Sequence, residues 1–536
     1  MGKQQSWDAV WDVYAMSTYN TITSLSESPL DENVLYIGTD DGIIQFTKNG
    51  GASWTKKLVN ELPNIPSSAF VNDIKADLHD INTVYVALDN HKFGDYKPYL
   101  LKSTNGGKSW KSITNGIPKN ELIWRIVQDH LNPNLMFLAT EYGIYVTLNQ
   151  GEKWIKFSEG LPTISFRDLA IQKHESDLVA ASFGRGFYIL DDYSPLRDVT
   201  TNTLANPTLF KPKKALQYKP VSGGTSSQGA SYFAAKNPDY GAIFTYYLPE
   251  SFKSLKSKRR KAEKQLNKEN KNIPFPGWDA LDEEKNEQGA SIILVIKDSD
   301  GNFITRINAP YKKGFNRIAW NLKVPNRTSL NMENINTNTT NYYYNLFADE
   351  GLYEVSMFSN INGNIKSLSK TQVFEVERIR ENVLQNPLNN TIENYIESFK
   401  TFKSEYEACI NNFNNASEKL ESYSKAAIYA KVNPGPIEKQ INRLKKEMQA
   451  LKQQLNGNTS KKEIREKDLQ SISSRLSVAS RGFSTTYGPT KTHMESFDKA
   501  KMLFNRIQPR LNEFINDDIP KIEDILKKAG VPTILE

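Results

Sequence analysis

The sequence predicts a mainly β chain with a helical C-terminus, built from three successive regions. Four similar stretches between residues 21 and 192 each contain several short strand-like segments. Further strand-like segments lie between residues 236 and 380, and a helical periodicity begins near residue 390. At 536 residues the chain is too long for one hydrophobic core, so several domains are expected.

The first region is an internal repeat. The segments NVLYIGTDDGI (33–43), NTVYVALDN (82–90), NLMFLATEYGI (134–144) and DLVAASFGRGF (177–187) align when Gly38, Ala87, Ala139 and Ala181 are taken as equivalent. Each unit opens with a short apolar strand and continues through a turn rich in Asp, Asn and Pro into further strands. Four short strands per repeat are typical of a β-propeller blade. We therefore predict about four blades within residues 1–195.

A distinctive turn occurs in three of these units, as TKNGGASW (47–54), KSTNGGKSW (102–110) and TLNQGEKW (147–154). The hydroxyl residue and the Asn can hydrogen-bond the backbone of the turn, and the Gly adopts angles that other residues resist. The Trp is expected to bury its ring between neighbouring blades. We assign a structural role to Thr47, Asn49, Gly51, Trp54, Ser103, Asn105, Gly107, Trp110, Thr147, Asn149, Gly151 and Trp154.

These turns resemble the Asp-box, or BNR repeat, of sialidases and sortilin-type (VPS10) receptors, although Asn replaces the usual Asp in all three copies. Three further segments make the chain similar to the C-terminal part of a bacterial sortilin-like family often labelled glycosyl hydrolase: GRGFYILDD (184–192), GAIFTYYLP (241–249) and GFNRIAWNL (314–322).

This resemblance implies an exported protein, either periplasmic, on the cell surface or secreted. Family members carry a signal peptide and further blades ahead of the matching part, and no signal peptide is visible in residues 1–17. The expectation is an incomplete propeller ring from a truncated or split gene. Its bare interblade surface would invite a partner, such as the missing N-terminal half of the propeller.

A linker over 196–235 and an immunoglobulin-like β-sandwich over 236–380 are expected next. The sandwich strands are predicted at 241–250, 290–308, 314–323, 351–358 and 371–378, with a hairpin turn at Asp300-Gly301. A basic helical insert occupies 251–285. Its run KSKRRKAEK (256–264) lacks interleaved aromatic residues, and the net charge of +7 is small, so no nucleic-acid partner is predicted.

Residues 381–536 predict a helical bundle or coiled coil. A heptad seam runs from Ile437 to Leu455, and THME (492–495) is interpreted as a capping box that opens the last helix. The seam is consistent with packing inside one bundle or with pairing between chains.

The candidate binding residues lie in the predicted blades. Arg125 and Arg167 begin innermost strands, and Arg185 lies in the GRG turn, so three arginines could converge on a carboxylate as in sialidases. The remaining candidates are Asp168 beside Arg167, Asp73 in another innermost strand, and His91 and Tyr96 in the long loop DNHKFGDYKPY (89–99). The full sialidase pattern, with its Tyr–Glu pair and acid Asp, is absent.

The function that the sequence favours is non-catalytic binding of an extracytoplasmic peptide, protein or glycan. One alternative is a glycoside hydrolase acting through funnel carboxylates, and another is an assembly protein that docks through its helical tail. Two facing carboxylates roughly 5–10 Å apart would favour hydrolysis, whereas arginines and aromatic residues without such a pair would favour binding. The sequence has one cysteine and five histidines, and none of them shows metal-ligand spacing, so neither a metal nor a cofactor is predicted. The sequence has no run of about 18 apolar residues, so no membrane span is predicted.

Overall fold

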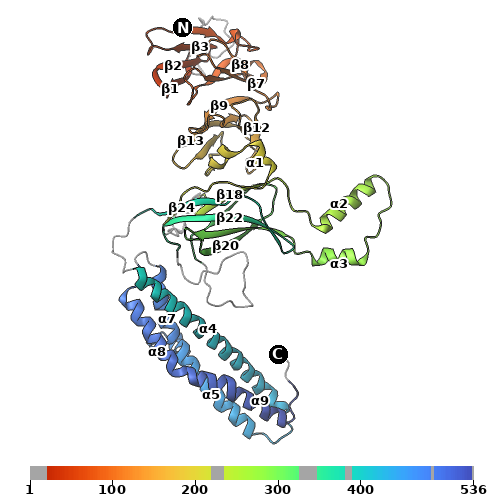
Figure 1. Cartoon of the computed structure of the whole chain (residues 1–536), viewed down its shortest axis with the longest axis vertical. Coiled ribbons are helices and arrows are strands. Elements are labelled where there is room, and N and C mark those ends of the chain that lie inside the picture. Colours follow the sequence, from red (N-terminus) through yellow and green to blue (C-terminus); the bar gives the residue numbers. More distant parts are fainter. Residues whose placement is uncertain are drawn as a thin grey trace. The chain divides into compact units, whose positions relative to one another are not determined.

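The computed structural model describes residues 21–157, 159–218, 235–324, 347–380, 389–484 and 488–533 (Figure 1). The chain divides into two compact units, Met1–Phe210 and Lys211–Glu536. The described part of the first unit is almost entirely β, and the second unit contains two sheets followed by a group of helices.

The described part of unit 1 contains four antiparallel sheets, A to D, whose strands follow one another in chain order. Sheet A comprises β1 (Ile22–Ser28), β2 (Asp31–Thr39), β3 (Ile43–Thr47) and β4 (Thr55–Leu58), and sheet B comprises β5 (Phe70–Ala76), β6 (Val84–Asn90), β7 (Asp95–Ser103) and β8 (Lys111–Ser112). Sheet C comprises β9 (Ile123–Gln128), β10 (Met136–Thr140), β11 (Gly143–Thr147) and β12 (Ile155–Phe157), and sheet D comprises β13 (Phe166–Gln172), β14 (Asp177–Ser182) and β15 (Phe187–Leu190).

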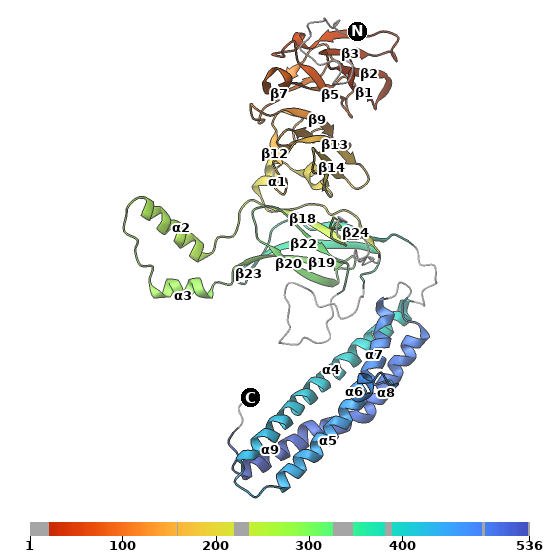
Figure 2. The same ribbon diagram turned by 180° about the vertical axis from the view of Figure 1, so that it is seen from behind.

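The sheets are stacked in chain order. Their first strands β1, β5, β9 and β13 contact one another in succession (Figure 2), and a separate apolar cluster fills the space between each sheet and the next. The register supports the alignment of the repeats: Gly38, Ala87, Ala139 and Ala181 each pair with the same position of the neighbouring first strand.

Sheet D has three strands in the described part of the chain, where the repeat predicts four. After β15 the chain leaves the sheet at Tyr193, whose buried phenol donates a 2.7 Å hydrogen bond to Asp129 Oδ2. Arg197 then pairs with the same carboxylate at 2.8 Å. These contacts tie the exit segment to sheet C, so it does not continue along the edge of β15.

The predicted linker 196–235 contains regular structure. Unit 1 ends with the 3₁₀ turn Ser194–Asp198, α1 (Thr201–Ala205) and β16 (Thr208–Leu209). In unit 2, β17 (Ala215–Gln217) pairs in parallel with β24 (Gln372–Arg378). These elements are only two to five residues long, so they are too short to show a helical or strand periodicity in the sequence.

The β part of unit 2 contains two sheets in contact. In one, β18 (Ala242–Leu248) pairs with β21 (Gly314–Trp320); in the other, the order is β17, β24, β22 (Gly351–Ile361), β19 (Ala290–Asp298) and β20 (Phe303–Pro310), with β23 (Asn364–Ser367) beside β22. The ring centroids of Phe244 and Phe374 lie 5.4 Å apart and join the two sheets. The predicted basic insert forms α2 (Leu255–Lys268) and α3 (Trp278–Asn286).

The helical part comprises α4 (Asn389–Ala426), α5 (Pro436–Asn456), α6 (Thr459–Glu463), α7 (Ile472–Arg481), α8 (Lys491–Glu513) and α9 (Ile519–Lys528). The heptad residues of α5 are buried in one core with α4, α7, α8 and α9, so this seam packs inside the bundle. The capping-box prediction was displaced by two residues. Thr490, not Thr492, caps α8, because the ring of His493 accepts a hydrogen bond from the Thr490 backbone.

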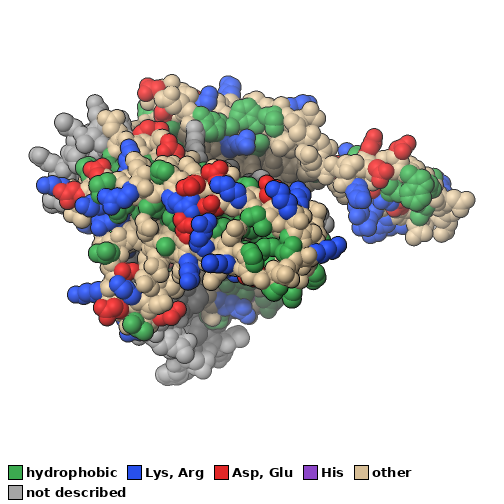
Figure 3. Space-filling view, turned by 90° about the horizontal axis from the view of Figure 1, so that it is seen from below, with side chains coloured by type: hydrophobic (Ala, Val, Ile, Leu, Met, Phe, Trp, Pro, Cys, Tyr) green, Lys and Arg blue, Asp and Glu red, His purple; other side chains and the backbone are tan. Residues whose placement is uncertain are grey.

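The molecular surface carries both signs of charge. On the face shown in Figure 3, Lys and Arg side chains are interspersed with Asp and Glu, as is usual for a solvated surface. Among the described residues, no helix is long and apolar enough to cross a membrane.

Candidate ligand-binding site

The candidate site lies where the first strands of the sheets begin. Each first strand has a register shift near its start, which leaves one extra residue opposite its neighbour: Thr23, Asn72, Trp124 or Arg167. A bulge of this kind redirects a side chain out of the regular alternation. Because neighbouring strands are antiparallel, β6, β10 and β14 end at the same end of the stack.

The residue after each bulge links the first strands to one another. Ser24 Oγ accepts a hydrogen bond from Ile74 N at 2.9 Å, and Asp73 Oδ2 accepts one from Ile126 N at 3.0 Å. Asp73 also accepts from Ser24 and from Arg125, and its side chain is fully buried. This predicted binding residue is therefore a structural link between three sheets.

Arg125 bridges two carboxylates at this end. Its Nη1 lies 3.2 Å from Asp73 Oδ1, and its Nε lies 3.0 Å from Asp168 Oδ1. Burial disfavours the charged guanidinium, but these carboxylates outweigh it and raise the pKa of Arg125 above its ordinary value. Arg125 is thus paired within the stack, and its convergence with Arg167 and Arg185 on a ligand carboxylate stays a prediction.

Arg167 stacks on an aromatic ring, and its Nη2 also lies 3.6 Å from Glu141 Oε2. Its guanidinium carbon lies 3.7 Å from the centroid of Trp124 and 5.3 Å from that of Phe183. The ring of His91 lies 5.9 Å from that of Trp124 and is itself 6.0 Å from Phe70. These five side chains, Phe70, His91, Trp124, Arg167 and Phe183, form what we call the aromatic row.

Polar contacts fix the middle of the aromatic row. Trp124 Nε1 donates to Glu141 Oε2 at 2.9 Å, and Ser165 Oγ donates to the same oxygen at 3.0 Å. The His91 ring lies 2.6 Å from the fully buried carboxylate of Asp89. The row itself remains accessible, since Phe183 and Arg167 are exposed and Phe70, His91 and Trp124 are half-buried.

Sequence reasoning identified part of this row. His91 and Arg167 were predicted, whereas Phe70, Trp124, Glu141 and Phe183 were not. Tyr96 and Arg185 are exposed, and within the described ranges neither makes a hydrogen bond, ion pair or ring contact with the row. The signal in the sequence that could have indicated this site was Trp124, an aromatic residue at the repeat position that Thr23 and Asn72 occupy in the first two units.

The three Asn-x-Gly turns at residues 47–54, 102–110 and 147–154 lie at the other end of the sheets. In the first, Asn49 Oδ1 accepts hydrogen bonds from Thr47 Oγ1 at 2.8 Å and from Ser53 N at 2.9 Å, and the other two turns repeat this arrangement. Trp110 and Trp154 are buried between sheets as predicted. Trp54 is not, because the Trp of each turn packs on the preceding sheet and sheet A has none among the described residues.

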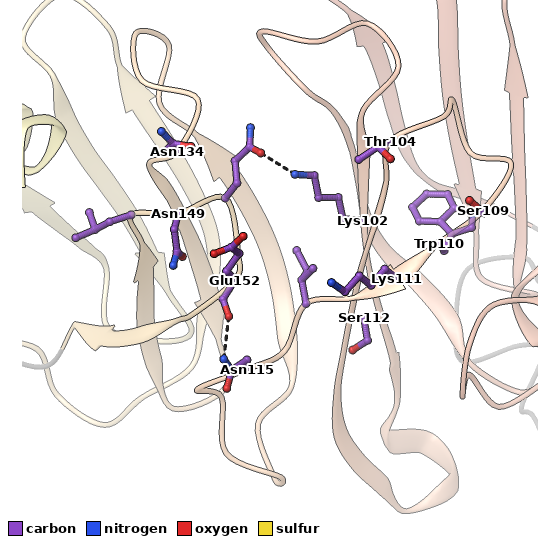
Figure 4. A pocket seen from close by; sticks show the side chains of 14 residues that line it. Lys102, Thr104, Ser109, Trp110, Lys111, Ser112, Asn115, Asn134, Asn149 and Glu152 are labelled. Carbon is purple, nitrogen blue, oxygen red and sulfur yellow. Dashed lines mark hydrogen bonds between the residues drawn. The ribbon is translucent and has the colours of Figure 1, made fainter. Parts of the chain in front are cut away.

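A pocket of about 830 Å³ lies beside these turns between sheets B and C (Figure 4). Lys102 Nζ donates to Gln150 Oε1 at 2.7 Å, and Asn115 Nδ2 donates to the carbonyl of Glu152 at 2.9 Å. Burial lowers the pKa of Lys102. Because these polar groups already bind one another across the seam, the pocket is a weaker candidate than the aromatic row. Among the described residues, no group of His, Cys, Asp and Glu could hold a metal ion.

No protein-family model matches the chain, and no curated protein matches it. Solved structures with similar parts include the GH74 enzyme of Niastella koreensis, at 16% identity over 32% of this chain and 29% of that one, with a TM-score of 0.27. Another is YCF48 bound to D1 peptide, at 20% identity over 32% of this chain and 52% of that one, with a TM-score of 0.26. A third is the GH74 xyloglucanase from Xanthomonas campestris, at 12% identity over 43% and 36%, with a TM-score of 0.29.

The matched parts span about a third to a half of these three proteins. All three TM-scores lie below 0.5, so no residue role or ligand is transferred from them.

Proposed function

We propose that unit 1 is part of a sortilin-like Asp-box β-propeller that binds a polypeptide ligand at the aromatic row without catalysis. In this proposal sheets A to D are blades, and the two sheets of unit 2 form an immunoglobulin-like accessory sandwich. The observation that carries the proposal is the accessible row of aromatic rings with Arg167 stacked among them.

The aromatic row suits an apolar ligand segment that also carries a negative charge. Exposed ring faces bury apolar groups, and Tyr, Trp and Arg dominate the energetics of protein recognition. Arg167 and the exposed Lys92, whose Nζ lies 5.0 Å from the Phe70 ring centroid, supply positive charge beside these faces. An acidic and apolar peptide segment matches both properties.

The hydrolase alternative is less well supported by the carboxylates at this end. A glycoside hydrolase needs two carboxyl groups that reach the substrate from opposite sides. Asp73 and Asp89 are fully buried, Asp168 is paired with Arg125, and Glu141 is bonded to Trp124 and Ser165.

The test is a displayed library of peptides with acidic and apolar residues, panned on the purified full chain. Peptides enriched on the wild type should lose at least tenfold in affinity on Trp124→Ala and on Arg167→Ala. The matched control is Trp278→Ala, which removes an exposed Trp from unit 2. Enriched peptides that bind Trp124→Ala unchanged would contradict the proposal.

A reducing-sugar assay on β-glucans and sialylated glycans tests the alternative. Hydrolysis by the wild type that is lost in Asp168→Asn would establish a glycosidase instead. Export from the cytoplasm also stays a prediction, and fractionation of cells that carry the gene would test it.

A further inference from the structure

Sheet D repeats a face that is buried in the other sheets. In the β-ladder Phe187 pairs with Ala181, as Ile144 pairs with Ala139 in sheet C. Ile144 is 3% exposed because sheet D covers it, whereas Phe187 is 74% exposed. A largely exposed Phe at a position that the repeat buries indicates a face that a partner covers.

A second pair of equivalent positions shows the same contrast. Ile189 pairs with Val179, as Val146 pairs with Phe137 in sheet C. Val146 is buried in the cluster between sheets C and D, whereas Ile189 is exposed. The outer face of sheet D therefore has the same apolar pattern as the faces of sheets A, B and C that pack against the next sheet in the chain.

Sheet A shows the complementary pattern on its own outer face. Leu25 directly follows Ser24, as Ile74 follows Asp73 in sheet B. Ile74 is fully buried against sheet A, whereas Leu25 is 60% exposed. Trp54 is 38% exposed, although the equivalent Trp rings pack on the preceding sheet. The outer face of sheet A therefore has the same apolar pattern as the faces of sheets B, C and D that pack against the preceding sheet.

The hydrogen-bonding groups at the two outer faces also match. Inside the stack, Ser24 and Asp73 accept bonds from the N–H groups of Ile74 and Ile126 in the next sheet. Asp168, 59% exposed on its side chain, occupies this acceptor position in sheet D. Leu25 occupies the donor position in sheet A. One chain thus carries both halves of the apolar packing that joins its sheets three times. The hydrogen bond to the next sheet's N–H is made twice, because between sheets C and D Arg125 donates to Asp168 instead.

We propose that a second copy of this chain covers these faces. Sheet D of one copy packs on sheet A of the other, and a two-fold ring forms when both such contacts are made. A head-to-tail contact leaves exposed ends unless the ring closes. Two copies double the four sheets of one chain, which stays within the roughly 4–8 blades of common propellers. This inference rests on the packing of unit 1 and is independent of ligand binding.

The test is the oligomeric state of the full chain, measured by sedimentation velocity over a hundredfold concentration range. The wild type is expected to sediment as a dimer. Phe187→Asp blocks the sheet D face and Leu25→Asp blocks the sheet A face, so each variant alone should be a monomer with unchanged circular dichroism. Leu131→Asp changes an exposed loop residue and should leave the dimer intact.

Mixing the two blocked variants distinguishes a dimer formed through sheets D and A from a dimer formed through any other surface. The free sheet D face of Leu25→Asp meets the free sheet A face of Phe187→Asp, so the mixture should form a one-to-one dimer. A monomeric wild type, a dimer that persists in both variants, or a mixture that stays monomeric would overturn the proposal. Polymers that grow with concentration would overturn the closed ring.

Discussion

The guanidinium carbon of Arg167 lies 3.7 Å from the ring centroid of Trp124, which joins the first strands of sheets C and D. A lysine keeps the charge but cannot stack a planar group on the ring. We expect Arg167→Lys to lower the free energy of unfolding of unit 1 by about 0.5–1 kcal/mol. Most of this loss should disappear in a Trp124→Leu background, as measured by a double-mutant cycle in urea.

The matched control for this cycle is Arg185→Lys, which changes an exposed arginine in the turn between β14 and β15. It should leave the urea midpoint unchanged in both backgrounds. Equal losses for Arg167→Lys with and without the Trp124 ring would show that the stacking contributes nothing.

Asp73 is the buried link between three sheets, and its removal should lower the free energy of unfolding of unit 1. Asp73→Ala leaves Arg125 without one partner and the Ile126 N–H without its acceptor. Breaking a buried pair of this kind costs about 3–5 kcal/mol. We expect hydrogen exchange to accelerate across β5 and β9 in this variant, measured by mass spectrometry on the full chain.

Asp168→Ala removes the other carboxylate that holds Arg125 and serves as the control. Asp168 is largely exposed, so its pair with Arg125 should contribute under about 1 kcal/mol. If hydrogen exchange accelerates equally in the two variants, the burial of Asp73 is not what makes its ion pair with Arg125 more stabilising than that of Asp168.

The repeat made the stacked sheets of unit 1 predictable, because strand length, turn chemistry and apolar spacing recur in every unit. The alignment of Ala87 with Ala139 needed only local sequence. The aromatic row was less predictable, since Phe70, Trp124 and Phe183 come from three sheets and meet only after these stack. The pairing of Arg125 is likewise a property of the assembled strands, because Asp73 and Asp168 lie in the two neighbouring sheets.

Asn105 should be replaceable by Asp but not by Ala. Its Oδ1 accepts hydrogen bonds from Ser103 Oγ at 3.0 Å and Ser109 N at 2.9 Å, which a carboxylate oxygen can also accept. Its amide donates to Ser109 Oγ, and that hydroxyl can reverse its role toward an Asp. We expect Asn105→Asp to change the free energy of unfolding by under about 0.5 kcal/mol and Asn105→Ala to lower it by about 1–3 kcal/mol.

Urea unfolding of the two variants beside Asn120→Ala, which changes an exposed residue outside the turn motif, would measure this difference. A large loss in Asn105→Asp would mean that the amide nitrogen is required. Asp would then not be an equivalent residue for Asn at these three turns.

The buried carboxylate of Asp129 should make unit 1 sensitive to acid. Burial by itself raises the pKa of Asp129, but hydrogen bonds from Arg197 and Tyr193 outweigh it and hold the pKa below its ordinary value of about 3.9. The unfolded chain therefore binds a proton at a higher pH than the folded chain does. The stabilisation is fully present above about pH 5 and is lost as the pH falls through the folded pKa.

Arg197→Met should remove most of this pH dependence. At pH 7 it should lower the free energy of unfolding by about 3 kcal/mol, because it leaves a buried carboxylate without its cation. The difference from the wild type should shrink as the pH falls from 5 toward 3, where the carboxyl group takes up its proton. Hydrogen exchange of residues 177–198 at pH 7, 5 and 3 would measure it, with Lys97→Met at an exposed ion pair as control. A difference that stays constant over this range would show that Arg197 acts by packing and not by its charge.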